Sequence, residues 1–405
     1  MFKYALATTF ILLLSVITFG FTVTIDSTGQ RTDGSKLWDI YYSLHDLSEC
    51  IEISVLAITS RSETLATETF LPSSDIDSIC SSGNYHIIWD IGTDEPGREF
   101  YSDLITIEIV AAKEGIIPGD CEDKIYIADS NNNRIVRLED IFGSVINTWG
   151  GTAVFSRPTD IEIGPERKVY ICDYLGRKVI QMDDMFGSGW LEFYHPGHDS
   201  AEINFPLALA VDGMGRIYVV DDEEDRISRM DDIHGTNWVS FGNSGDGIGE
   251  FNAPSAVLID NYGRLYIADN FNHRIVRIDD ISGAGWESFG RFGTGEGEFR
   301  NPSGIAQDRT GRIYITDRAN RRIVRIDNIS GDGWIDFGEA GDGVGQFNGP
   351  IDIEIGPSGK IYITDQPNHR IVRINDISGT GWQEIGSSGS AIGEFYYPRG
   401  IDIGY

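Results

Sequence analysis

The 405-residue chain has few cysteines and few basic residues, and each shortage excludes a class of protein. None of its four cysteines forms a Cys-x-x-Cys pair or clusters with histidine at a zinc-binding spacing, so no zinc-finger motif is present. Lys and Arg number 32 against 63 for Asp and Glu, a formal net charge of −31. This charge repels phosphate backbones and anionic lipid surfaces. We therefore expect no nucleic-acid partner and an acidic, soluble surface.

Long apolar runs are also scarce, and the one that exists is N-terminal. Lys3 precedes an apolar stretch over residues 5–19, and residues 18–20 offer a small-residue cleavage site. The stretch is short for a spanning helix, which needs about 20 residues. We expect residues 1–20 to be a signal peptide and the protein to be exported to the periplasm, the cell surface or the medium. An uncleaved N-terminal anchor is the alternative, and no other membrane contact is expected.

Internal repetition dominates the sequence beyond residue 117. Blocks close to Ile-Tyr-Ile-x-Asp recur, and successive tyrosines are spaced by 44, 48, 48, 48 and 48 residues. These tyrosines are Tyr126, Tyr170, Tyr218, Tyr266, Tyr314 and Tyr362. A period in the forties, with β-branched and aromatic residues alternating, predicts four strands per unit, the size of a propeller blade. Turns rich in Asn, Asp and Gly separate the predicted strands, and no helical period interrupts them.

The repeat core resembles a known family. Residues 266–278 read Tyr-Ile-Ala-Asp-x-x-Asn-His-Arg-Ile-Val-Arg-Ile, and residues 361–374 match again. Asn133 or Arg321 replaces the histidine in other copies. This pattern resembles the NHL repeat, over residues 117–405. The resemblance implies a six-bladed β-propeller. Such propellers include many interaction modules, and also lyases and lactonases that hold a metal at the central channel.

The strand count indicates how the ring closes. Second, third and outer strands occur six times, whereas the first unit lacks its own inner strand. The last inner strand, residues 400–403, has no partners after it. Joining the two halves gives six complete blades without an open sheet edge. We therefore expect residues 400–403 to pair beside residues 125–127.

Residues 23–112 follow a different pattern. Residues 37–42, 51–55, 86–90 and 105–109 read as short strands separated by polar turns. Several short strands in this length predict an immunoglobulin- or fibronectin-like β-sandwich. The pattern resembles the small β domains beside repeat modules in bacterial surface proteins. The predicted fold class is therefore all-β, with this sandwich before a six-bladed propeller.

The cysteines suit an oxidising compartment. Cys50 and Cys80 lie in the N-terminal domain and are the candidate disulfide. Cys121 and Cys172 lie on strands of adjacent blades, with an offset of seven residues. That offset separates the thiols by roughly 20 Å along the strands, whereas a disulfide tolerates a Cα separation of about 7 Å. Cys172 is therefore expected to be a small buried apolar residue.

Two sets of charged residues repeat with the blades. The aspartate that ends each second strand is followed five positions later by Arg or Lys, as in Asp269 and Arg274, which predicts a charge-assisted brace across the hairpin turn. The long glycine loops between blades carry acidic residues, and loops of this kind often bind ligands. These candidate ligand-binding residues are Asp246, Glu250, Glu296, Glu298, Asp342 and Glu394. The alternative interpretation is an acidic rim that only promotes solubility.

Metal-binding signals are few. Residues 129–133 have the spacing of a calcium loop, but Arg134 follows and no downstream glutamate completes it. His195, His198 and Asp199 replace a glycine loop and are metal candidates by residue type. No cofactor is predicted from these signals, although calcium or zinc would suit such ligands.

No nucleophile–base pair identifies a catalytic residue. We expect a monomeric, non-enzymatic binding or scaffold protein whose propeller face engages a protein or glycan. The alternative is a metal-dependent lyase or lactonase-type hydrolase, which needs inward-facing acidic or histidine side chains. The inner strands are mostly aliphatic, with the acidic exceptions Glu162, Asp352, Glu354 and Asp402.

Overall fold

The computed structural model describes residues 123–143, 146–195 and 202–404, together with the backbone of seven strands in the preceding part of the chain. The chain divides into two compact units, residues 1–121 and 122–405. Within the described residues no helix has the length and hydrophobicity that a membrane span requires. The predicted signal segment and the Cys50–Cys80 pair lie outside the described residues.

The described part of the N-terminal unit consists of antiparallel strands. One sheet has the order β1 (Thr22–Gln30), β2 (Leu37–His45) and β6 (Gly83–Asp90). In a second sheet, β3 (Ile51–Thr59) pairs with β4 (Thr64–Leu65), β5 (Asp77–Ile79) and β7 (Ile105–Ala112). The four segments predicted as strands coincide with β2, β3, β6 and β7.

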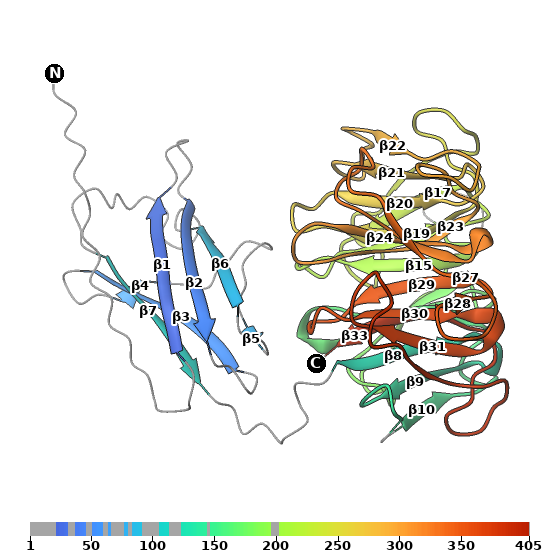
Figure 1. The fold of residues 1–405 in the computed structure, drawn as a ribbon, viewed down its shortest axis with the longest axis horizontal. Helices are drawn as coiled ribbons and strands as arrows, with labels where there is room; N and C mark the ends of the chain where they lie inside the picture. The colour runs from blue at the N-terminus through green and yellow to red at the C-terminus, as the bar shows by residue number, and fades with distance from the viewer. Residues whose placement is uncertain are drawn as a thin grey trace. The chain divides into compact units, whose positions relative to one another are not determined.

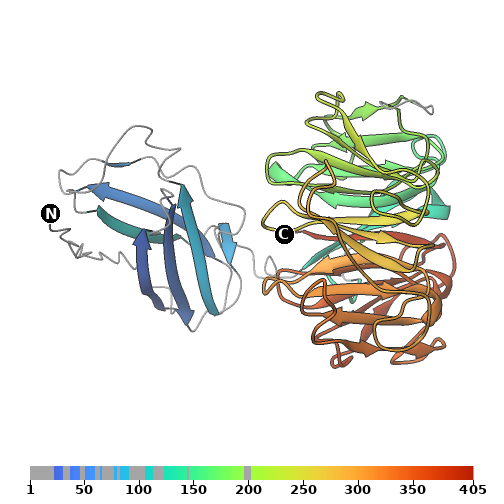
Figure 2. The same cartoon turned by 90° about the horizontal axis from the view of Figure 1, so that it is seen from above.

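The second unit is a six-bladed propeller, as predicted, and each blade is a four-stranded antiparallel sheet. Figures 1 and 2 show the propeller from the side, and the colour passes from green through yellow to red along its chain. From channel to rim, blade 1 contains β33 (Pro398–Gly404), β8 (Lys124–Asp129), β9 (Arg134–Leu138) and β10 (Ile146–Gly150). Blade 2 contains β11 (Pro158–Ile163), β12 (Val169–Asp173), β13 (Lys178–Met182) and β14 (Leu191–Phe193). Blade 3 contains β15 (Pro206–Val211), β16 (Ile217–Asp221), β17 (Arg226–Met230) and β18 (Val239–Phe241).

The other three blades follow the same plan. Blade 4 contains β19 (Pro254–Ile259), β20 (Leu265–Asp269), β21 (Arg274–Ile278) and β22 (Glu287–Phe289). Blade 5 contains β23 (Pro302–Gln307), β24 (Ile313–Asp317), β25 (Arg322–Ile326) and β26 (Ile335–Phe337). Blade 6 contains β29 (Pro350–Ile355), β30 (Ile361–Asp365), β31 (Arg370–Ile374) and β32 (Gln383–Ile385). Short 3-10 turns are η1 (Ser130–Asn132), η2 (Pro165–Arg167), η3 (Arg318–Asn320) and η4 (Gln366–Asn368), and β27 (Glu339–Ala340) pairs with β28 (Gln346–Phe347) in one loop.

The C-terminal strand closes the ring in the predicted register. In blade 1, Ile401 pairs with Ile127 and Ile403 with Ile125. Figure 1 shows β33 beside β8 at this closure. Both isoleucines of β33 are buried in the cluster that joins blades 6 and 1. The closing strand therefore pairs with the edge of β8 and also contributes side chains to the core.

Aromatic side chains fill the space between blades. Phe155, Phe251, Phe299, Phe347 and Phe395 are the largest fully buried side chains. In blade 5 the ring of Phe299 lies 5.3 Å from that of Trp334, between centroids. Cys172 is fully buried in the cluster that contains Tyr170 and Leu209, and it is unbonded, as predicted. Cys121 lies outside the described residues.

A buried aspartate at the end of each second strand fastens the preceding inter-blade loop. In all six blades it accepts a hydrogen bond from a backbone N–H of that loop. The pairs are Tyr396 to Asp129, Ser156 to Asp173, Asn204 to Asp221, Asn252 to Asp269, Arg300 to Asp317 and Asn348 to Asp365, at 2.7–3.0 Å. All six aspartates are buried. We call this arrangement, with the arginine described next, the blade clasp.

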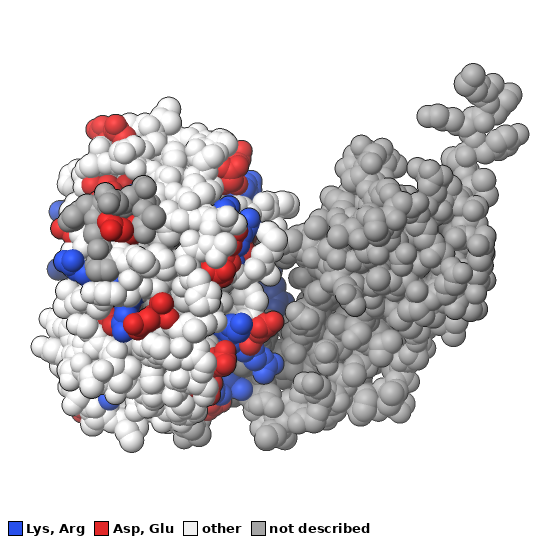
Figure 3. Space-filling model, turned by 180° about the vertical axis from the view of Figure 1, so that it is seen from behind, with Lys and Arg blue, Asp and Glu red and all other residues white. Residues whose placement is uncertain are grey.

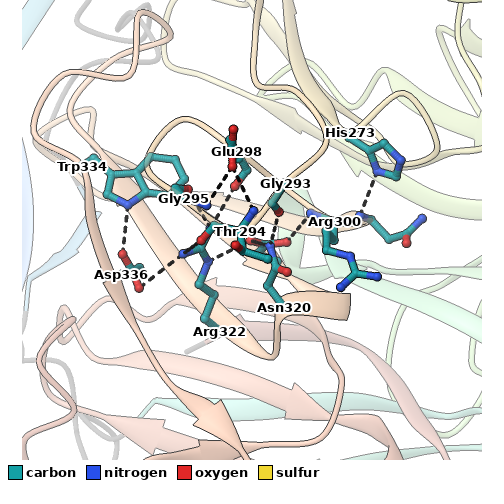
Figure 4. Close-up of polar contacts among 12 residues, drawn as sticks. His273, Gly293, Thr294, Gly295, Glu298, Arg300, Asn320, Arg322, Trp334 and Asp336 are labelled. Carbon is teal, nitrogen blue, oxygen red and sulfur yellow. Dashed lines mark hydrogen bonds and ion pairs between the residues drawn. The ribbon is translucent and has the colours of Figure 1, made fainter.

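In blades 1, 4, 5 and 6 the arginine five positions later completes the clasp. Figure 4 shows blade 5, where Arg322 Nε donates to Asp317 at 2.9 Å. The other nitrogens of Arg322 donate to the carbonyl oxygens of Thr294, at 3.0 Å, and of Glu298, at 2.9 Å. The same Asp–Arg pair forms at Asp129 with Arg134, Asp269 with Arg274, and Asp365 with Arg370. In blade 2 the basic residue, Lys178, instead pairs with Glu192 at 2.8 Å.

Removing the closing strand tests the architecture. Deletion of residues 398–405 exposes the edge of β8 and strips Ile401 and Ile403 from the core, so we expect a large fall in Tm for the whole propeller. The measurement is thermal unfolding followed by near-UV circular dichroism, with a chain lacking only residue 405 as control. Equal melting of the truncated and control proteins would contradict the closure.

Candidate binding site at the channel mouth

The second and third strands repeat closely among the blades, whereas the two residues that follow each second-strand aspartate vary. Each inner strand begins with a proline that pairs with the second-strand aspartate, so the residue after that aspartate lies at one end of the channel. This residue differs in every blade. The six are Ser130, Tyr174, Asp222, Asn270, Arg318 and Gln366. We call this end of the channel, with these six residues, the channel mouth.

Several side chains of the channel mouth contact one another. The Tyr174 hydroxyl donates to Asp222 Oδ2 at 3.5 Å, and Arg318 donates to Gln366 Oε1 at 3.5 Å. The other Asp222 oxygen, Oδ1, is buried and has no hydrogen-bond partner among the described residues, and the same is true of Ser130 Oγ. Burial is the main cause that raises the pKa of Asp222 to about 6 and that of Tyr174 to about 12.

Two further arginines reach this end of the channel from the inner strands. Arg157 immediately precedes β11, and its guanidinium lies 5.5 Å from the centroid of the Tyr174 ring. Arg399 is the second residue of β33 and lines the channel cavity. Burial, followed by the positive charges of Arg318 and Arg157, lowers the pKa of Arg399 to about 10. The mouth therefore concentrates positive charge on an otherwise acidic protein.

The channel below the mouth is acidic on one side and apolar on the other. Its cavity has a volume of about 150 Å³. Three neighbouring inner strands carry its acidic side chains, which are Asp352 and Glu354 on β29, Asp402 on β33, and Asp160 and Glu162 on β11. The facing strands contribute small or aliphatic residues, including Leu207, Ala210 and Leu258.

Three channel aspartates link neighbouring inner strands. Asp160 accepts from the Leu209 N–H at 2.8 Å, and Asp352 accepts from the Ile401 N–H at 2.9 Å. Asp402 accepts in the same way from Ile163 at 2.5 Å. Gly400 makes room for one of these carboxylates, because a Cβ at that position would lie 2.4 Å from Asp160 Oδ1. These aspartates therefore hold the inner ring together.

The two glutamates are less constrained. Glu354 accepts one hydrogen bond, from the Ile355 N–H at 3.0 Å, and the Glu162 side chain has no hydrogen-bond partner among the described residues. Burial, followed by the charge of neighbouring carboxylates such as Asp402, raises the pKa of both glutamates well above the usual range. Burial likewise raises the pKa of Asp352 and of Asp402 to about 6. These channel carboxyl groups therefore keep their protons to a higher pH than exposed carboxyl groups do.

The acidic loop residues singled out from the sequence fall into two groups. Asp246, Glu296 and Asp342 are exposed. The other three are half-buried and fold back onto their own loops. Glu250 accepts from the Gly247 N–H, Glu298 from the Gly295 N–H and Glu394 from the Ala391 N–H, at 2.8–2.9 Å. Figure 4 shows this contact for Glu298.

The metal candidates are described only in part. His195 follows β14, and its ring lies 4.9 Å from that of Phe193. His198 and Asp199 lie outside the described residues. Across residues 123–143, 146–195 and 202–404, no group of three or more His, Cys, Asp or Glu has a metal-binding arrangement. The Asp129 carboxylate of the calcium-like sequence bonds Arg134, Asn132 and the Tyr396 N–H.

Sequence reasoning did not single out the residues of the mouth. Arg157, Arg318 and Arg399 are far apart in the chain, and each reads locally as a surface arginine. The available signal was that the residue after each repeat aspartate varies in all six blades, as does the residue that follows it, whereas the aspartate itself recurs.

Comparison with known proteins agrees with this architecture. The NHL repeat model matches residues 299–326, so the chain contains an NHL repeat. With its fold, this defines a six-bladed β-propeller that contains an NHL repeat. No curated protein sequence matches the chain.

Three solved structures resemble this chain at low identity. A streptogramin B lyase is 19% identical with a TM-score of 0.48, over 68% of this chain and 82% of that one. Virginiamycin B lyase from Staphylococcus aureus is 18% identical with a TM-score of 0.47, over 68% and 84%. A protein of unknown function from Bacteroides caccae is 11% identical with a TM-score of 0.52, over 70% and 98%. At these identities the likeness concerns the fold alone.

The raised pKa values in the channel predict a pH-dependent stability. The pKa of these channel carboxyl groups is higher in the folded protein than in the unfolded chain. Their contribution to folding stability is therefore fully present below about pH 4, where they are protonated in both states. It is lost as the pH rises through the folded pKa. Glu162→Gln mimics the protonated side chain. We expect it to raise Tm at pH 7.5 by a few degrees, equivalent to about 1 kcal/mol, and to have little effect at pH 4.5.

The measurement is differential scanning calorimetry at both pH values. Glu296→Gln, which changes an exposed loop residue, serves as control and should leave Tm unchanged at both. An equal effect of Glu162→Gln at the two pH values would contradict a channel carboxyl group with a raised pKa.

Proposed function

We propose that the protein is an exported, non-enzymatic binding module whose propeller captures a protein or glycan at the channel mouth. The observation that carries this proposal is the loss of repeat symmetry at the mouth. Residues with a structural role, such as the clasp aspartates, recur in every blade. Six different residues at equivalent positions fit one asymmetric ligand better than they fit packing.

The surroundings of the mouth support the same choice of face. The inter-blade loops lie at this end of the propeller, and several carry large exposed apolar side chains that suit a contact surface. These include Ile248, Phe292, Val344 and Ile392. In the view of Figure 3, acidic and basic side chains of the propeller lie in small mixed groups without one broad basic patch. The formal net charge of −31 favours a protein or glycan over a nucleic acid.

The remaining parts of the chain complete the proposal. Residues 1–20 direct export, and the strands of the N-terminal unit form an immunoglobulin- or fibronectin-like sandwich that presents the propeller outside the cytoplasm. This organisation suits a periplasmic, cell-surface or secreted location, and oxidation of Cys50 and Cys80 to a disulfide suits the same compartments.

Arrays of oligosaccharides and of peptides test the binding proposal. We expect ligands bound by the labelled protein to lose at least tenfold in signal with Tyr174→Ala and with Asp222→Ala, because both side chains belong to the mouth. Asp332→Ala is the matched control and should retain binding, because Asp332 is exposed on the turn between β25 and β26, at the end of the propeller away from the mouth. Array ligands that are insensitive to both mouth variants would contradict the proposed site.

A second candidate is a metal-dependent lyase or lactonase-type hydrolase. One observation bears on it: Glu162, Glu354 and Asp402 come from three neighbouring strands and line one cavity, although among the described residues they have no metal-binding arrangement. Carboxylate oxygens are the ligands that hard divalent cations prefer, although these groups would have to release protons first. Metal analysis of the purified protein separates the two functions. A stoichiometric divalent metal that is lost with Glu162→Gln would favour the enzyme, whereas the binding module requires none.

A further inference from the structure

The positive charge at the channel mouth comes from three different blades. Arg399 belongs to the inner strand of blade 1, Arg157 precedes that of blade 2, and Arg318 begins the turn η3 of blade 5. Arg157 and Arg318 are exposed and Arg399 is half-buried, so a ligand can reach all three. Burial and the positive charges of Arg318 and Arg157 lower the pKa of Arg399, and the negative charges of Asp222 and Asp160 only partly oppose this effect.

None of these three arginines has a carboxylate partner in an ion pair within the described residues. Elsewhere in the propeller most arginines are paired, as in Arg274 with Asp269 and Arg264 with Asp260. Acidic partners are plentiful in a chain of formal net charge −31. Unpaired like charges held close together are destabilising, and an anionic ligand would offset this cost.

The neighbouring acceptors limit which anion fits. Asp222 Oδ1 is buried without a hydrogen-bond partner among the described residues, and Asp160 and Glu162 line the cavity below. The negative charge of these carboxyl groups disfavours a ligand that is anionic over its whole surface, such as a free inorganic anion. They accept hydrogen bonds from hydroxyl groups, however, and guanidinium groups bind carboxylates through two parallel hydrogen bonds. A ligand with a carboxylate beside several hydroxyls satisfies both requirements.

We propose that the channel mouth recognises the uronic acid residue of an acidic glycan. Arg157, Arg318 and Arg399 bind the sugar carboxylate, and Asp222 accepts a hydrogen bond from a sugar hydroxyl. This inference rests on the proposed binding function and specifies its ligand. A glycan fits better than an acidic peptide because its hydroxyls supply several donors for the acidic wall of a small cavity.

Isothermal titration calorimetry with defined oligosaccharides tests the inference. The panel comprises trimers of galacturonate, mannuronate and guluronate and a hyaluronan tetrasaccharide, with methyl-esterified trigalacturonate and a Glu-rich peptide for comparison. We expect at least one uronate oligomer to bind, and the matching methyl ester, which lacks the charge, to bind at least tenfold more weakly. Each of Arg157→Gln, Arg318→Gln and Arg399→Gln should weaken binding at least tenfold.

Arg309→Gln is the matched control, because Arg309 is exposed on the turn between β23 and β24, at the end of the propeller away from the mouth. Thermal unfolding of every variant separates lost binding from lost folding. If the change at position 399 destabilises the closing strand β33, the variants at the exposed positions 157 and 318 still test the inference.

The outcomes separate this inference from the proposed function. If no uronate binds, or if the methyl ester binds equally well, carboxylate recognition is wrong. Array ligands that still depend on Tyr174 and Asp222 would then leave the binding module intact. If the peptide binds through the same arginines and the uronates do not, the ligand is an acidic protein segment and the glycan assignment is wrong.

Discussion

A buried carboxylate at the end of each second strand is the interaction on which the propeller depends. Asp317 shows why: it accepts from the Arg300 N–H of the inter-blade loop, from Asn320 and from Arg322. Burial raises the pKa of Asp317 and is the unfavourable contribution, while these three hydrogen bonds oppose it. Arg322 also donates hydrogen bonds to three carbonyl oxygens of the loop. The Asp317–Arg322 ion pair therefore fixes the position of a long glycine-rich loop that has few apolar side chains to pack.

The fold was readable from the sequence because its determinants are local and repeated. The tyrosine spacing, the turn residues and the Asp–Arg offset each lie within one blade, so periodicity alone gives the strands. Closure also followed from counting strands. The contact of the Glu298 carboxylate with its own loop was harder to predict from the sequence. The same loop sequence is compatible with a carboxylate that faces solvent and with one that accepts a hydrogen bond from the loop backbone.

The candidate site was not readable in this way because it is built from differences between blades. Arg157, Arg318 and Arg399 meet only when the ring closes, and none is part of the repeat pattern. Blade 2 shows the same limit on a smaller scale. Its Lys178 occupies the clasp position, but the shorter, single-headed side chain pairs with Glu192. Spacing predicts that a basic residue is present, whereas the shape of its head group decides which partners it can reach.

The closing strand has a consequence for how the chain folds. The hydrogen bond from the Tyr396 N–H to Asp129 joins residues 267 positions apart, and the pairing of β33 with β8 is similarly remote. Contacts of such separation form slowly, because the intervening chain must be ordered or looped out first. During synthesis the blades can assemble one after another, but the ring stays open until residues 398–404 become available. Completion of the propeller is therefore a single late event, and the arginine cluster of the mouth comes into existence only at that moment.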